Sequence, residues 1–193
     1  MTRLYVLVIL LPLFISCSDD REVNPKEILI SDNWVSEKFI FQGTEYDSLI
    51  VYGLVTDTIP SYVGDIFPGD MLRADAWMEL KFSQTFYWSY LFNNSFYRCV
   101  NCSNYIHIYK NEFPSSGKYN LVENYLETEK IINRQWRPDT TYVIEFIEND
   151  RIKIYDWLSF PVPANDPDLS IFQINDLEVE SGDYLFDVIF KKK

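Results

Sequence analysis

The sequence predicts an all-β domain whose strands form an antiparallel up-and-down barrel, with a two-sheet β-sandwich as the alternative. Tyrosine, phenylalanine and tryptophan number 14, 14 and 5, and these side chains favour strands. Apolar and polar residues alternate along several segments, which gives each strand one apolar face. Turn-forming residues separate these segments and place consecutive strands side by side. A sheet with one apolar face must cover it, and closure into a barrel does so while removing exposed edges.

The first half of the domain contains one helical turn and four expected strands. Residues 27–31 suit a single turn of helix ahead of the first strand. Met78, Leu80 and Phe82 alternate onto one face of a later strand, and Gly53 marks a candidate bulge. We expect the strands over residues 34–41, 46–55, 77–82 and 86–91.

Tight turns divide the second half into hairpins. We place turns at Asn93-Asn94, Glu123-Asn124 and Asn149-Asp150, because each pair separates two β-rich segments. A closed barrel requires the first strand to pair with the last strand or another late one. The expected strands of this half are residues 119–122, 125–130, 141–148, 151–157 and 184–190.

One long stretch interrupts this pattern. Residues 57–76 include Pro60, Gly64, Pro68 and Gly69. Connections longer than about 12–15 residues are usually functional loops or disordered segments. We therefore expect a lid or binding loop here.

The N-terminal segment has the organisation of an export signal. Arg3 precedes an apolar run of 12 residues from Leu4 to Ile15, which is too short for the roughly 20 residues of a membrane-spanning helix. The run ends at Phe14-Ile15-Ser16-Cys17, which resembles the bacterial lipobox, although that family prefers Leu where Phe14 stands. The resemblance implies that Cys17 is linked to diacylglycerol and becomes the first residue of the mature chain.

This interpretation divides the chain into three parts. Residues 1–16 are a lipoprotein signal peptide, residues 17–26 are the acylated cysteine with a flexible tether, and residues 27–193 are a single barrel-like domain. We expect an outer-membrane lipoprotein that is periplasmic or surface-exposed. The polar run Ser18-Asp19-Asp20-Arg21-Glu22 resembles the acidic signal that directs some lipoproteins to the cell surface, and it also suits a solvated tether.

The charge balance excludes one class of partner. The formal net charge is −12, so phosphate backbones should repel the chain and nucleic acid is not an expected partner. No motif calls for a cofactor, and we expect none.

Cys99-Val100-Asn101-Cys102 is the most distinctive local motif. Two cysteines at the ends of a four-residue turn lie within bridging range, and exported thiols tend to pair. We therefore predict a disulfide between Cys99 and Cys102. Zinc bound with His107 is the alternative, but no fourth ligand is specified.

No pattern predicts catalysis, so we expect this protein not to be an enzyme, and a hydrolase is the remote alternative. His107 is the only histidine, and no Gly-x-Ser-x-Gly elbow is present. Ser115-Ser116-Gly117-Lys118 matches the Ser-x-x-Lys pattern of penicillin-binding enzymes, which requires a helical turn. Pro114 and Gly117 disfavour a helix there.

The spacing of several segments resembles bacterial lipocalin-like domains. Residues 27–34 resemble the short helix and Gly-x-Trp strand that open this family, with Asp32 in place of the glycine. Leu80-Lys81-Phe82 with Phe86-Tyr87-Trp88 resembles a strand-turn-strand unit of the family, and residues 117–128 and 142–154 resemble later hairpins. The resemblance implies an up-and-down barrel of about eight strands that is wide enough for one small ligand.

Two functions follow from these expectations. The first is a membrane-anchored lipoprotein that binds a small apolar or amphipathic ligand, with Phe86, Trp88 and Tyr90 pointing inward as ligand-binding residues. The second is a surface subunit that binds an envelope protein or a glycan through exposed aromatic side chains and has no ligand cavity.

Overall fold

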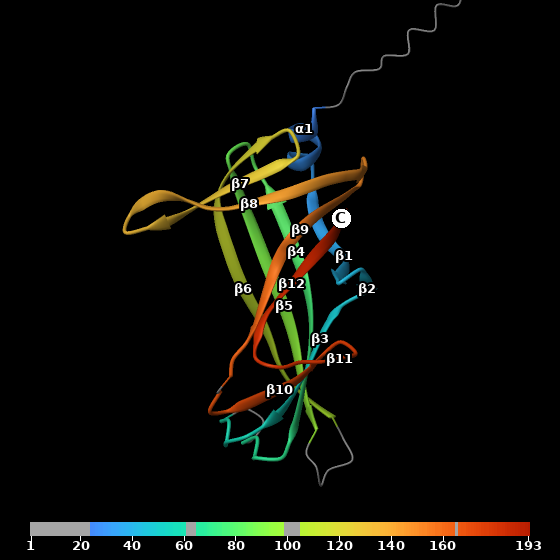
Figure 1. Cartoon of the computed structure of the whole chain (residues 1–193), viewed down its shortest axis with the longest axis vertical. Coiled ribbons are helices and arrows are strands. Elements are labelled where there is room, and N and C mark those ends of the chain that lie inside the picture. The colour runs from blue at the N-terminus through green and yellow to red at the C-terminus, as the bar shows by residue number, and fades with distance from the viewer. Residues whose placement is uncertain (1–23, 61–64, 99–104, 165) are drawn as a thin grey trace, which may run out of the picture.

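The computed structural model describes residues 24–60, 65–98, 105–164 and 166–193. These residues form one short helix and twelve strands (Figure 1). The elements are α1 (Pro25–Ile30), β1 (Asn33–Phe41), β2 (Thr44–Tyr46), β3 (Leu49–Val55), β4 (Met71–Phe82), β5 (Phe86–Arg98), β6 (Tyr105–Val122), β7 (Tyr125–Ile132), β8 (Gln135–Glu148), β9 (Arg151–Val162), β10 (Leu169–Ile174), β11 (Leu177–Glu178) and β12 (Gly182–Lys192).

Eight of the strands close into an antiparallel barrel, as the sequence predicts. The barrel runs in the order β4-β5-β6-β7-β8-β9-β12-β1, and the pairing of β1 with β4 closes it. Six consecutive strands, from β4 to β9, lie beside their neighbours in the chain, which is the up-and-down arrangement. The two-sheet sandwich is therefore not the fold of this chain.

The first and last strands pair, which confirms the expected route to closure. β1 and β12 are antiparallel, with Trp34 opposite Lys192 and Ile40 opposite Asp187. Trp34, Phe186 and Phe190 are completely buried between them and the rest of the barrel. Closure thus buries the apolar face of both strands.

Helix α1 covers the upper end of the barrel (Figure 1). The side chain of Asn24 caps the helix by accepting a hydrogen bond from the Lys26 amide, and Pro25 occupies the first turn. Leu29 is fully buried, and its carbonyl accepts a hydrogen bond from the Trp34 indole nitrogen at 3.0 Å. The helical turn expected from the sequence is therefore an end cap that is joined to the first strand.

The sheet branches at β4. The first half of β4 pairs with β3, and its last residues pair with β1. β10 pairs with the other edge of β3, and β11 pairs with β10, so these strands extend the sheet beyond the barrel at its lower end. The bulge expected at Gly53 lies instead on β10, where Phe172 is the extra residue between the partners of Gly53 and Tyr52.

The structure corrects one turn and one loop. Glu123-Asn124 and Asn149-Asp150 are turns as predicted, but Asn93-Asn94 lies inside β5. Both asparagines pair with β4 and β6, so the ladders on the two sides override their turn preference. The loop expected over residues 57–76 ends at Asp70, and Ile59 pairs with Ile66 within it.

Within the described residues, no helix is long and apolar enough to cross a membrane.

Candidate functional site: a side opening in the barrel

The barrel wall is incomplete on one side. β6 pairs with β7 only from Lys118 to Val122, and β8 pairs with β9 only from Arg151 to Ile154. Among the described residues, no pairing continues the wall from β6 residues 105–117 or from β9 residues 155–162 on this side. We call the gap between these two segments the side opening.

A β-bulge accounts for the gap. Between Glu127 and Glu129, β7 has one residue where β8 has two, Asp139 and Thr140. The Thr128 hydroxyl donates to the Thr140 carbonyl and accepts from the Thr140 amide, which fixes the bulge. Bulges bend a strand and increase its twist. The rest of the β7–β8 hairpin therefore leaves the barrel and projects sideways (Figure 1).

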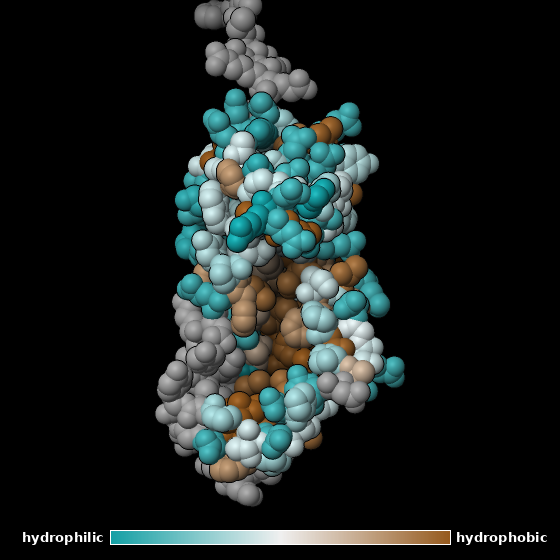
Figure 2. Space-filling model, turned by 90° about the vertical axis from the view of Figure 1, so that its left-hand side faces the viewer, coloured by the Kyte–Doolittle hydropathy of each residue, from teal (hydrophilic) through white to brown (hydrophobic). Residues whose placement is uncertain are grey.

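An apolar hollow lies behind the side opening. Figure 2 shows hydrophobic side chains deep in the molecule below the projecting hairpin, with mainly hydrophilic residues above them. The strand registers assign its walls: Met78 and Leu91 lie opposite each other on β4 and β5, and Leu91 lies opposite Phe113 on β6. In the part of β9 that borders the side opening, residues 155–162, Leu158 and Val162 are buried.

Phe113 shows that this space is open. It lies on the inward face of β6, because it is in register with Leu91, yet 53% of its surface is exposed. Inward aromatic residues in a filled barrel are buried, as Phe186 is. Phe113 is exposed because the wall that would face it is missing.

Three aromatic residues occupy the upper end of the hollow, where the wall closes. The Trp157 ring lies 4.7 Å from the Tyr142 ring and 5.8 Å from the Tyr87 ring, measured between centroids. Burial raises the pKa of the Tyr87 phenol, which is hydrogen-bonded to Ser115, and it also raises the pKa of the Tyr142 phenol. Both phenols are neutral at physiological pH, and the raised pKa extends that neutral range further into alkaline pH.

Gly117 makes room for this cluster. A Cβ atom at Gly117 would lie 2.8 Å from a ring carbon of Tyr87 and 2.4 Å from the Glu129 carbonyl oxygen. The absence of a side chain lets the Tyr87 ring lie against β6. The hollow thus combines apolar walls with two phenols at one end, an arrangement that suits an apolar molecule with a polar end.

The predicted ligand-binding residues lie on the other face of β5. Phe86, Trp88 and Tyr90 point outward, whereas Tyr87, Ser89 and Leu91 point inward; this corrects the expected orientation. The alternation of residues along β5 does not show which face of the strand points inward, because both faces carry aromatic residues. The pairing of Phe82 with Tyr87 and of Leu80 with Ser89 decides the choice, since Phe82 and Leu80 are buried.

The outward residues form an aromatic stripe on the barrel surface. The Phe86 ring lies 6.3 Å from Trp88, and the Tyr90 ring lies 6.2 Å from Phe92. Phe92 in turn stacks on Trp77 of β4 at 5.4 Å. These residues are partly exposed, and the stripe consists of Trp77, Phe86, Trp88, Tyr90 and Phe92.

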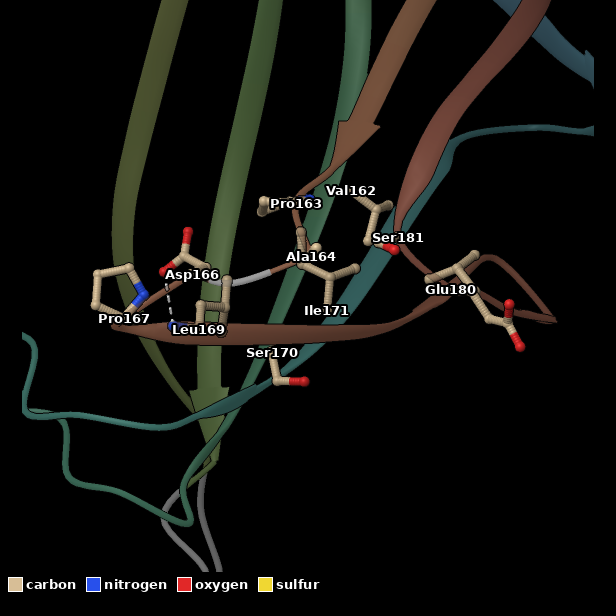
Figure 3. A pocket seen from close by; sticks show the side chains of 11 residues that line it. Val162, Pro163, Ala164, Asp166, Pro167, Leu169, Ser170, Ile171, Glu180 and Ser181 are labelled. Atoms are coloured by element: carbon tan, nitrogen blue, oxygen red, sulfur yellow. Dashed lines mark hydrogen bonds between the residues drawn. The ribbon is translucent and has the colours of Figure 1, made fainter.

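A second cavity, of about 520 Å³, lies at the lower end between the end of β9, β10 and the residues that join β11 to β12 (Figure 3). Asp166 accepts hydrogen bonds from the amides of Asp168 and Leu169, so its carboxylate caps the backbone of this loop. Figure 3 shows Glu180 on the opposite side, away from Asp166. The two carboxylates do not converge on one point.

The remaining sequence motifs do not form a catalytic or metal site among the described residues. Cys17, Cys99 and Cys102 lie outside the described residues, so lipidation and the disulfide stay predictions. His107 and the Ser115–Lys118 motif lie on strand β6, where Ser115 and Lys118 point to opposite faces. Among the residues that the structure covers, no group of three or more His, Cys, Asp or Glu side chains is placed to hold a metal ion.

Comparison with known proteins gives no match to a family model, a curated protein or a solved structure.

Proposed function

We propose that this chain is a membrane-tethered, lipocalin-like binding protein that takes a small apolar or amphipathic ligand into the barrel through the side opening. The exposed, inward-facing Phe113 is the observation that carries the proposal. Exposed apolar surface is costly in water, and an apolar ligand that covers it recovers that free energy. The apolar hollow in Figure 2 is the space such a ligand fills.

The tether is the second part of this proposal. Acylation at Cys17 would hold the barrel at the outer membrane, on its periplasmic or surface-exposed side, because two or more acyl chains anchor a protein stably. The proposed activity is binding without catalysis, and it involves no metal ion or cofactor.

Ligand binding can be tested with a fluorescent fatty acid, which gains emission when it leaves water. The protein should enhance the emission, and Phe113→Glu should weaken binding about tenfold or more, because a carboxylate would face the apolar ligand. Ser116→Glu is the matched control: it places the same charge on the same strand, but on the outward face opposite Trp88. Equal binding by the two variants would refute the side opening as the binding site.

The aromatic stripe favours a second candidate function. Stacked, partly exposed tryptophan and tyrosine rings suit an envelope glycan or protein partner that binds outside the barrel. A double change, Trp88→Ser with Tyr90→Ser, would then abolish cross-linking to envelope components and leave fatty-acid binding intact. Unchanged cross-linking would remove this candidate.

A further inference from the structure

The end of the projecting β7–β8 hairpin is basic, although the protein as a whole is acidic. Residues 130–137 contain the three basic residues Lys130, Arg134 and Arg137 and no acidic residue, in a protein of net charge −12. We call these eight residues the hairpin tip. An anionic surface attracts such a basic segment, even on an acidic protein.

Apolar side chains accompany these charges. Ile131 and Ile132 are 62% and 43% exposed, which makes Ile131 the most exposed of the large apolar residues in the described chain. Within the structure as described, no ion pair joins Arg134 or Arg137 to an acid, whereas Lys130 is paired with Asp139. Exposed isoleucines beside arginines that are not ion-paired are the combination that inserts shallowly into a lipid headgroup region.

Trp136 holds one strand of the hairpin tip against the outside of the barrel. Trp136 packs edge-on against Phe86 with ring centroids 5.8 Å apart, and the Lys118 ammonium lies 4.7 Å from the Trp136 centroid. These contacts brace the hairpin on the outer face of β5 and β6. The aromatic Phe86 thus has a structural role in supporting the hairpin.

The turn at the tip keeps a charge at a strained position. Asn133 and Arg134 both have positive φ, 51° and 66°, which is the two-residue turn that favours Asn-Gly. An arginine in the left-handed region is disfavoured relative to glycine. The chain therefore retains a guanidinium at the point of the hairpin at a cost in stability.

We propose that the hairpin tip docks on an anionic phospholipid surface and thereby brings the side opening to the membrane. The tip projects from the end of the barrel that carries α1 (Figure 1), and six residues lie between Cys17 and Asn24, which gives a maximum span of about 25 Å. The hairpin also lies directly above the apolar hollow (Figure 2). Docking would serve to deliver a ligand between the bilayer and the barrel, and this purpose rests on the proposed function. The docking itself does not depend on that function.

The test uses residues 17–193 with Cys17→Ser, which removes the anchor and keeps every strand pairing of the barrel. Flotation with vesicles of phosphatidylcholine, with and without phosphatidylglycerol, measures docking. We expect binding that requires phosphatidylglycerol and weakens with added salt. Arg134→Gly should reduce binding about fivefold, the effect of one basic residue near an anionic surface. Because glycine suits the left-handed turn better, that loss would not come from a misfolded hairpin.

Two further variants test whether the hairpin tip itself, and not any exposed apolar residue, binds the vesicles. Ile131→Asp should abolish binding, whereas Leu185→Asp, at an equally apolar but distant site that is 47% exposed, should not change it. Equal effects of these two variants, or binding independent of phosphatidylglycerol, would overturn the docking proposal. The fatty-acid assay on Arg134→Gly keeps the two proposals apart: we expect unchanged ligand binding, so a failure of docking leaves the ligand site standing.

Discussion

At the residue scale, a missing side chain shapes the upper end of the hollow. Gly117 is buried on the inward face of β6, and Tyr87 fills the space in front of it. Any Cβ there would collide with the Glu129 backbone, which side-chain movement does not relieve. This glycine therefore serves close packing and not a turn.

Gly117→Val should destabilise the fold, because it overpacks this contact. We expect the free energy of unfolding to fall by about 1–3 kcal/mol, measured by urea denaturation. Ser116→Val is the control, since it adds the same side chain one residue away on the exposed outward face. A Gly117→Val protein as stable as this control would contradict the assigned packing.

Tyr119 makes stability depend on pH in the alkaline range. Burial raises its pKa to about 12, and its hydroxyl donates to the Ser83 carbonyl at 2.6 Å. The unfolded chain has the ordinary tyrosine pKa of about 10, so the folded state holds this proton more tightly. The contribution of Tyr119 to the free energy of unfolding is fully present below about pH 10 and is lost as the pH rises towards 12.

Urea denaturation across this pH range checks the sign of the effect. We expect the free energy of unfolding to decrease as the pH rises above about 10, and the decrease to be smaller in Tyr119→Phe, which has no phenol to titrate. The variant also loses one hydrogen bond, so its stability near neutral pH should be about 1 kcal/mol lower. A steeper decrease in the variant would show that Tyr119 is not the group responsible.

At the scale of elements, α1 stabilises the barrel by closing one end. Only six residues form this helix, too few to be stable in isolation, so packing against the barrel keeps it folded. Leu29 and the Trp34 indole provide that packing.

Leu29→Ala should destabilise the protein by about 2–4 kcal/mol, because it leaves a cavity under the helix. Thermal or urea unfolding measures this loss. Glu27→Gln, on the exposed side of the same helix, should change stability by less than about 1 kcal/mol. If Leu29→Ala behaved like Glu27→Gln, the helix would not contribute to closing the barrel end.

At the scale of the whole molecule, the proposed anchor at Cys17 would set where the barrel operates. Cys17→Ala should release the protein from the membrane fraction or mislocalise it, because acylation at that sulfur is the proposed attachment. Cell fractionation with carbonate extraction checks this, and Ser18→Ala is a control that leaves the sulfur in place. A Cys17→Ala protein that still behaves as an integral membrane protein would refute the lipoprotein hypothesis.

Local patterns predict the fold class of this chain well. The alternation in β4 and the turns at Glu123-Asn124 and Asn149-Asp150 are properties of short segments, and they depend little on distant residues. Pairing of the first and last strands was also predicted, because a sheet with one apolar face must close or be covered.

The inward face of β5 and the side opening depend on long-range pairing instead. Phe86, Trp88 and Tyr90 alternate as regularly as Tyr87, Ser89 and Leu91, so only the register with β4 and β6 fixes which set lines the barrel. Pairing with neighbouring strands also decides two other features. It carries β5 through Asn93-Asn94, and it places the bulge of β8 at Asp139-Thr140. Residue order fixes the period of a strand, but its partners fix its register, its length and the place where the barrel wall ends.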